Sequence, residues 1–172
     1  MAVLFLPRVA TLWMLVALVV AAIGMEVSRV HLRPVNLWLF QHLRPLFKTS
    51  EWTRATGASW LVLAALVAFL VFPKGIAGLA LLFVAVGDPV AALVGSRAPG
   101  PRIGGKSPLG SLAFAAIGTL VAWALAMGPG PVVGWTVVAG AVAGALAELA
   151  PLPLDDNLKV PLVSGAIMAY AL

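Results

Sequence analysis

An aspartate, Asp88, lies inside an apolar run that is long enough to cross a membrane and that ends at Arg97. An ionised Asp near the centre of a membrane helix costs about 2.5–3.5 kcal/mol on insertion scales, so such a residue usually has a partner or a function. Mg²⁺ in nucleotide sites is held by one or two carboxylates together with phosphate oxygens and water. The position of Asp88 therefore predicts a metal ligand. The alternative is a structural ion pair with Arg97, Arg102 or Lys106.

A short basic, glycine-rich loop follows this run and ends at Lys106. Backbone N–H groups and cations are the groups that bind phosphates. Lys106 is expected to contact phosphate as a mobile charge, and Arg97 and Arg102 to clamp it through paired hydrogen bonds. Ser107 or Ser111 is expected to cap the next helix, whose first amides also favour an anion. Anchoring of the loop at a membrane surface is the alternative for these cations.

A second acidic motif lies near the end of the chain. Glu148 ends a late apolar run, and Asp155-Asp156-Asn157 follow after a Pro-Leu-Pro-Leu turn. These carboxylates are candidates for a second metal site or for a base that accepts the proton of a hydroxyl substrate. Helix N-capping is the alternative for Asp155 and Asp156.

Two other acidic residues have a basic residue three positions later, Glu26 with Arg29 and Glu51 with Arg54. This spacing allows local ion pairs, which is the alternative to a role in the site. The two histidines are isolated and share no ligand spacing. The sequence contains no GxxxxGK[ST] or GxSxG motif, so any nucleotide site is expected to be of a kind specific to membrane proteins.

The composition indicates an integral membrane protein. Of 172 residues, 62% are hydrophobic and only 10% charged, with a mean hydropathy of +1.08, whereas soluble domains carry about 25% charged residues. The net charge of +5 is expected to reflect loop asymmetry and anionic headgroups, with no nucleic-acid partner. The absence of cysteine excludes disulfides and thiolate chemistry.

The expected fold is all-α, a single polytopic domain over residues 1–172. Six apolar runs predict transmembrane helices, at roughly 9–25, 57–73, 75–95, 109–127, 132–150 and 159–172. The first is expected to end at Met25-Glu26-Val27. The polar segment 26–56 is expected to hold an interfacial amphipathic helix that starts at Pro34 and is interrupted at Pro45, followed by a short helix capped by Ser50.

The distribution of positive charge predicts the orientation. If the N-terminus lies outside, nine of the eleven Lys and Arg residues fall in loops on one side, and only Arg8 and Lys74 fall on the other. Cytoplasmic loops carry the excess of Lys and Arg. Segments 26–56, 96–108 and 151–158 are therefore expected in the cytoplasm, where nucleotide triphosphates are found.

The sequence resembles the CTP-dependent lipid kinases, the family of dolichol kinase, phytol kinase and CTP-dependent diacylglycerol kinase, which are related to the phosphatidate cytidylyltransferases. Three blocks carry the resemblance, at 87–97, 105–111 and 148–162. They are similar to the family's Gly-Asp-x-x-Ala-x-x-x-Gly pattern, its Gly-Lys loop and its Glu…Asp-Asn-Leu-Thr-[Ile/Val]-Pro element. A fourth run, which contains Glu26, Asn36, Glu51 and Arg54, is similar to the N-terminal part of prokaryotic members. Leu109 and Lys159 depart from the pattern, which commonly has Glu and Thr there.

This resemblance implies transfer of the γ-phosphoryl group of CTP to the primary hydroxyl of a membrane lipid alcohol, either polyprenol- or phytol-like or diacylglycerol. It implies Mg²⁺ on Asp88 with Asp155 or Asp156, and a hydroxyl oriented or deprotonated by Glu148, Asp155 or Asp156. The nucleotide-binding residues that it implies are Gly87, Gly95, Arg97, Arg102, Gly105, Lys106, Ser107 and Asn157. The accessory residues are Glu26, Asn36, Glu51 and Arg54.

Two other functional classes remain open at this point. A cytidylyltransferase would attack the α-phosphate and release pyrophosphate. A small transporter or assembly protein would use buried charge without catalysis. The lipid substrate and the choice among CTP, UTP and ATP stay undecided, and a homodimer is left open. The compact, prokaryote-like form favours a plasma membrane, with the site facing the cytoplasm.

Overall fold

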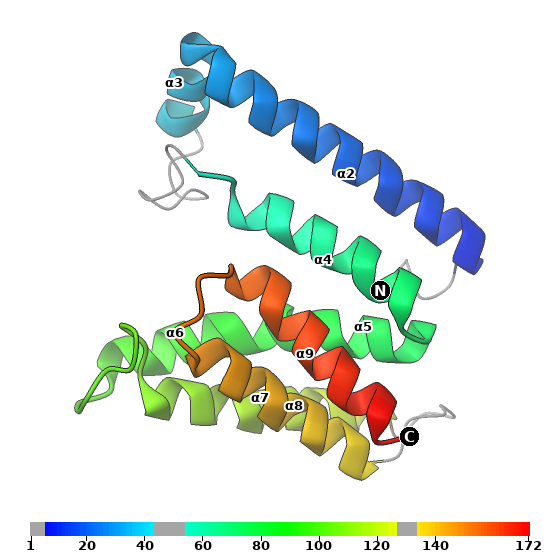
Figure 1. The fold of residues 1–172 in the computed structure, drawn as a ribbon. Helices are drawn as coiled ribbons and strands as arrows, with labels where there is room; N and C mark the ends of the chain where they lie inside the picture. Colours follow the sequence, from blue (N-terminus) through cyan, green and yellow to red (C-terminus); the bar gives the residue numbers. More distant parts are fainter. Residues whose placement is uncertain (1–5, 43–53, 127–133) are drawn as a thin grey trace.

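The computed structural model describes residues 6–42, 54–126 and 134–172, and these residues form helices joined by loops (Figure 1). The all-α expectation is confirmed for this part of the chain. In chain order the elements are α2 (Arg8–His31), α3 (Arg33–His42), α4 (Gly57–Val71), α5 (Lys74–Leu82), the π-helix η3 (Phe83–Gly87), α6 (Asp88–Arg97), α7 (Pro108–Ala126), α8 (Gly134–Leu149) and α9 (Asp156–Tyr170).

Each of the six expected apolar runs contains a helix, but the helices differ in length. Two are long and apolar enough to cross a membrane, α2 and the continuous rod Lys74–Arg97 that combines α5, η3 and α6. The helices α4, α7, α8 and α9 have 15, 19, 16 and 15 residues. A full crossing needs about 20 residues. Six transmembrane crossings therefore remain a hypothesis, while two candidate spans are observed.

The N-terminal helix is longer than expected. The predicted end at Met25-Glu26-Val27 is wrong, because α2 continues to His31. Glu26 can stay within the helix because its carboxylate pairs with Arg29 one turn later. Pro34 is the second residue of α3, where a proline's missing N–H breaks no helical hydrogen bond. The expected features at Pro45 and Ser50 lie outside the described residues.

Helices α4 to α9 pack against one another, whereas α2 lies at the edge and contacts α4 (Figure 1). Only 11% of the apolar window of α2 is buried. Its exposed side chains include Val9, Trp13, Val20 and Ile23. The outer face of α2 is therefore a long apolar surface with no protein neighbour among the described residues.

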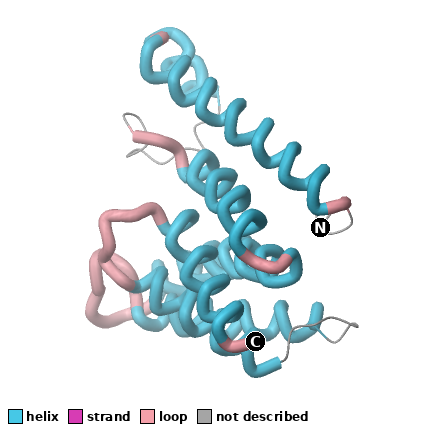
Figure 2. The backbone as a smooth tube through the Cα atoms, turned by 45° about the vertical axis from the view of Figure 1, so that its right-hand side comes forward, coloured by secondary structure: helices cyan, strands magenta, loops and turns pink. Residues whose placement is uncertain are grey.

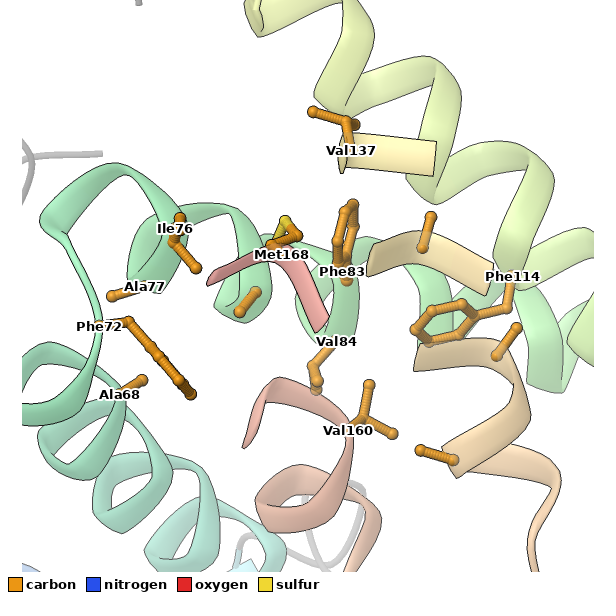
Figure 3. Close-up of a cluster of buried hydrophobic side chains, with 14 of the residues drawn as sticks. Ala68, Phe72, Ile76, Ala77, Phe83, Val84, Phe114, Val137, Val160 and Met168 are labelled. Carbon is orange, nitrogen blue, oxygen red and sulfur yellow. The ribbon is translucent and has the colours of Figure 1, made fainter. Parts of the chain in front are cut away.

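The core lies between the central rod, α7, α8 and α9. Phe83 from η3 and Phe114 from α7 are fully buried beside Val137, Val160 and Met168 (Figure 3). Aromatic rings of this size bury about 150–250 Å² each, so these two dominate the apolar contact at the centre of the bundle.

Small residues let the helices around this core approach closely. A Cβ at Gly140 would lie 2.5 Å from the Met168 side chain, and one at Gly144 would lie 2.6 Å from Ser164 Oγ. The small-xxx-small pattern of α8 is thus used for packing against α9 within the chain, as the simpler of its two interpretations predicts.

The two ends of the bundle differ in charge. The loops 98–107 and 150–155 lie together at one end (Figure 2), on the same side of the molecule as the start of α4 and the end of α2 (Figure 1). At the opposite end Arg8 donates to the carbonyl of Phe69 (3.2 Å) and Lys74 to that of Leu6 (2.5 Å). The first end holds the remaining cations in the described part of the chain: Arg29, Arg54, Arg97, Arg102, Lys106 and Lys159, together with Arg33 in the backbone of α3. This segregation agrees with the predicted loop asymmetry.

The tight contact of α9 with the end of α4 gives a test of the packing. A Cβ at Gly165 would lie 2.4 Å from the ring of Phe72, whereas a Cβ at Gly24 in α2 meets nothing within 4 Å. We expect Gly165→Ala to lower the free energy of unfolding by about 1–3 kcal/mol through overpacking. Gly24→Ala should raise it by about 0.5–1 kcal/mol, because alanine favours a helix. Thermal unfolding in detergent, followed by tryptophan fluorescence, measures both. Equal melting temperatures for the two variants would contradict this packing.

Candidate functional site

Three carboxylates that are far apart in the sequence meet at the basic end of the bundle. Asp88 begins α6, Glu148 lies in the last turn of α8, and Asp156 begins α9. Each offers one oxygen atom, and these three atoms all lie within 4.8 Å of one another. Glu148 is buried, with 6% of its surface exposed, and the two aspartates are half-buried. These residues are termed the acidic cluster.

Lys106 occupies the same place. Its Nζ lies 3.1 Å from Glu148 Oε1, donates to Asp156 Oδ2, and donates to the backbone carbonyl of Glu148 at 2.6 Å. Burial alone would lower the pKa of this ammonium group, but the hydrogen bond and charge of Asp156 and the charge of Glu148 outweigh that effect. The pKa of Lys106 is therefore raised above its usual value, and the side chain carries a full positive charge at neutral pH.

A tight turn sets the position of Lys106. Ile103 and Lys106 exchange two backbone hydrogen bonds, of 2.8 and 3.0 Å, around Gly104 and Gly105. Both glycines have positive φ, +57° and +86°, which residues with a side chain rarely adopt. Gly104 also lies against Pro151, since a Cβ there would be 2.9 Å from the proline ring. Gly104 and Gly105, the second of which was expected to bind nucleotide, thus shape the turn that directs Lys106 toward α8 and α9.

Ser111 supports the most buried carboxylate. Its Oγ donates to Glu148 Oε2 at 2.6 Å, and only 5% of Ser111 is exposed. Sequence reasoning considered Ser111 only as a helix cap and missed this contact. The i, i+4 spacing of Ser107 and Ser111 was an available signal, because it places both residues on one face at the start of α7.

The two adjacent aspartates have different surroundings. Asp155 is the N-cap of α9 and accepts a hydrogen bond from the backbone N–H of Asn157 (3.0 Å), so the capping interpretation is confirmed for Asp155. Asp156 belongs to the acidic cluster. Its Oδ1 lies 2.9 Å from the Nζ of Lys159, which also donates to the carbonyl of Ala150 at 2.7 Å.

Lys159 is a site residue that the sequence analysis recorded only as a departure from the family pattern. It is 95% buried, with 5% of its surface exposed. A lysine inside an apolar run, three residues after an aspartate, was the available signal.

The position of Asp88 follows from an irregular turn in the central rod. Pro89 has no N–H to give to the carbonyl of Ala85, and its ring would clash with that carbonyl in a regular α-helix. The wider turn of η3, immediately before, accommodates the proline. Gly87 fits beneath Phe114, where a Cβ would lie 2.5 Å from the ring. The π-helix and this aromatic contact together determine the direction in which α6 leaves the core with Asp88 at its start.

The remaining nucleotide-binding candidates include Gly95, Ser107, Arg97 and Arg102. Gly95 packs against the start of α7, with Ser107 Cβ 3.3 Å from where a Cβ would be, and Ser107 itself is buried. Arg97 and Arg102 are exposed. Each donates to a backbone carbonyl of its own segment at 3.4 Å, Leu93 for Arg97 and Ala98 for Arg102. The structure thus gives Gly95 a packing role and leaves both guanidinium groups at the surface.

Glu26 belongs to a second polar cluster, which ties α2 to α4. Its Oε1 accepts hydrogen bonds from the Thr56 N–H and from Ser59 Oγ, both at 2.8 Å. Its Oε2 pairs with the fully buried Arg29, which also donates to the carbonyl of Arg54 at 2.6 Å. The predicted local pairing of Glu26 with Arg29 is confirmed.

The other accessory candidates and the histidines add no ligand to the acidic cluster in the described structure. Asn36 is buried in α3, and Glu51 lies outside the described residues. The rings of His31 and His42 each bond a backbone carbonyl one turn earlier in their own helix, at 2.9 Å.

The donor set of the acidic cluster suits a hard divalent cation. Mg²⁺ takes oxygen ligands at about 2.0–2.1 Å in octahedral geometry, so its ligands lie about 3–4 Å apart. The cluster oxygens lie within 4.8 Å of one another and would draw together around such an ion. Asp88, Glu148 and Asp156 are therefore the residues that would hold it, and Lys106 at present pairs with two of them, Glu148 and Asp156.

Comparisons with protein-family models, curated proteins and solved structures gave no match. The resemblance to the CTP-dependent lipid kinases therefore rests on the sequence motifs. The structure adds an independent fact: Asp88, Lys106, Glu148 and Asp156, which come from the three motifs, lie at one place.

The contact of Ser111 with Glu148 can be tested through stability. We expect Ser111→Ala to lower the free energy of unfolding by about 1–3 kcal/mol, because it leaves a buried carboxylate oxygen without its donor. Ser96→Ala is the matched control, since Ser96 is exposed and its hydroxyl donates to the carbonyl of Leu93 in its own helix. Its effect should stay within about 0.5 kcal/mol. Denaturation of both variants in the same detergent distinguishes them. A Ser111→Ala variant as stable as the control would refute a supporting role.

Proposed function

We propose that this protein is a membrane-embedded, Mg²⁺-dependent enzyme that transfers the γ-phosphoryl group of CTP to the hydroxyl of a membrane lipid alcohol. One observation carries the proposal. Asp88, Glu148, Asp156 and Lys106 come from four separate segments and meet at the end of the bundle where the cations gather. Phosphoryl transfer needs a carboxylate-held cation and positive charge around a polyphosphate, and little other chemistry from the protein.

In this proposal each part of the site has a defined task. The acidic cluster holds the cation, which neutralises charge on the phosphates. Lys106, Arg97 and Arg102 bind the triphosphate. The lipid oxygen forms a bond to the γ-phosphorus while the bond from that phosphorus to the β–γ bridging oxygen breaks. The hydroxyl proton passes to a carboxylate oxygen of the cluster, and CDP leaves.

The membrane arrangement is part of the same proposal. The rods α2 and Lys74–Arg97 are long enough to cross, and α4, α7, α8 and α9 would complete a six-helix domain around them. The segregation of Lys and Arg supports a cytoplasmic location for the acidic cluster, where CTP is available. The tail of the substrate would remain in the bilayer while its hydroxyl reaches the site from the side.

The direct test is a transfer assay with the detergent-purified full chain. It uses CTP labelled separately at the α and γ positions, a panel of prenols and diacylglycerol, and buffers with and without Mg²⁺. The proposal expects γ-label in one lipid, dependent on Mg²⁺. Transfer of α-label to a lipid phosphate would instead identify a cytidylyltransferase. No transfer from CTP, UTP or ATP would leave the non-enzymatic alternative.

The neighbouring aspartates provide a matched pair of variants for this assay. Asp156→Asn removes a cluster carboxylate and should lower turnover at least about 100-fold, since metal ligands contribute several kcal/mol to such reactions. Asp155→Asn should retain turnover within about three-fold, because asparagine caps a helix nearly as well as aspartate. Initial rates at saturating CTP measure both. Equal losses in the two variants would show that this assignment of roles is wrong.

A further inference from the structure

We propose that Lys106 is an internal counter-ion that competes with the divalent cation for the acidic cluster and leaves it when a polyphosphate accepts its charge. The inference rests on the cation site of the proposed function. It assigns Lys106 a second role, the control of cation affinity before nucleotide binds. The two roles use two positions of one side chain.

The competition follows from shared ligands. Lys106 Nζ contacts Glu148 Oε1 at 3.1 Å and also donates to Asp156. A Mg²⁺ ion bound to Glu148 Oε1 at about 2.1 Å could lie no farther than about 5 Å from that nitrogen. An ammonium group and a divalent cation at this separation, in a partly buried site, repel each other strongly. Cation binding and the observed position of Lys106 therefore oppose each other.

Movement of the Lys106 side chain relieves this repulsion. The side chain of Lys106 is 28% exposed and follows an exposed glycine turn at the surface. The flexible four-carbon side chain allows the ammonium group to turn away from the carboxylates toward solvent.

Lys159 provides the contrast within the same site. It also pairs with Asp156, but it is 5% exposed and its Nζ is bound to the carbonyl of Ala150 at 2.7 Å. It contacts the other oxygen of Asp156, Oδ1, and comes from the same helix. Lys159 is thus a fixed positive charge, and Lys106 is the exchangeable one.

Two consequences follow. Without nucleotide the wild-type protein should bind divalent cations weakly, because the Lys106 ammonium group already pairs with two of the three carboxylates. Nucleotide and cation should then bind with positive coupling. The triphosphate gives Lys106 a new anionic partner, while the cation takes over the carboxylates of Glu148 and Asp156. A free cation is thereby kept from occupying the site unproductively.

The experiment measures Mn²⁺ alone, as a probe for Mg²⁺, by electron paramagnetic resonance of the free ion with the detergent-purified full chain. Lys106→Gln should bind Mn²⁺ at least ten-fold more tightly than the wild type. Lys106→Arg, which keeps the charge, should bind it as weakly as the wild type. Lys159→Gln should change the affinity by less than about three-fold, because Lys106 still occupies the cluster. Adding Asp88→Asn to Lys106→Gln should remove the gain.

The opposite result overturns the inference. If Lys106→Gln binds Mn²⁺ no more tightly than the wild type, or not at all, Lys106 does not compete with the cation. Neither result depends on phosphoryl transfer. A protein that transfers phosphate to no lipid could still show the competition, and an active kinase could lack it.

A second measurement uses the wild-type protein and avoids any folding defect of the variants. Acetylation of lysines, followed by mass spectrometry, reports how accessible each amine is. Saturating Mg²⁺ should increase the rate at Lys106 several-fold and leave Lys74 and Lys159 unchanged. An unchanged rate at Lys106 under saturating Mg²⁺ would contradict displacement.

Discussion

Three carboxylates within 4.8 Å of one another repel, and the structure depends on the positive charges that hold them together. Lys106 and Lys159 bind the two oxygens of Asp156 from opposite directions in the sequence, and Lys106 also reaches Glu148. A partly buried group of like charges without such partners would be strongly unfavourable. The loop that carries Lys106, the end of α8 and the start of α9 are therefore fixed relative to one another by this charge balance.

The apolar bundle supplies the rigid frame for this balance. Gly87, Gly144 and Gly165 let Phe114, Ser164 and Phe72 pack directly against neighbouring backbone, so α4, η3, α7, α8 and α9 lie close together. The carboxylates project from helix ends just beyond this packed region. Side chains carried by helices are positioned more precisely than side chains on loops, which suits the proposed cation site.

The outer helix α2 is attached in a different way. Its apolar face is mostly exposed, and its contact with α4 is secured at the basic end by Glu26 and Arg29 and at the other end by Arg8. Glu26 and Arg29 form an ion pair, and each also makes a hydrogen bond with the backbone just before α4. The resemblance groups Glu26 with the site, and the structure gives it a role in holding α2 in place.

The sequence by itself determined the helical class, the positions of the apolar helices and the uneven distribution of charge, because apolar periodicity and composition are local properties. It also identified Asp88, Lys106, Glu148 and Asp156 as chemically significant. Tertiary structure alone decided which of these residues meet. It distinguished the two neighbouring aspartates, because Asp155 caps α9 and Asp156 belongs to the acidic cluster. It also added Ser111 and Lys159 to the residues that contact the cluster. It also gave Glu26 hydrogen-bond donors at the start of α4, Thr56 and Ser59, in addition to the local pair with Arg29. Such contacts depend on which helix faces which, and no local pattern in the chain specifies that.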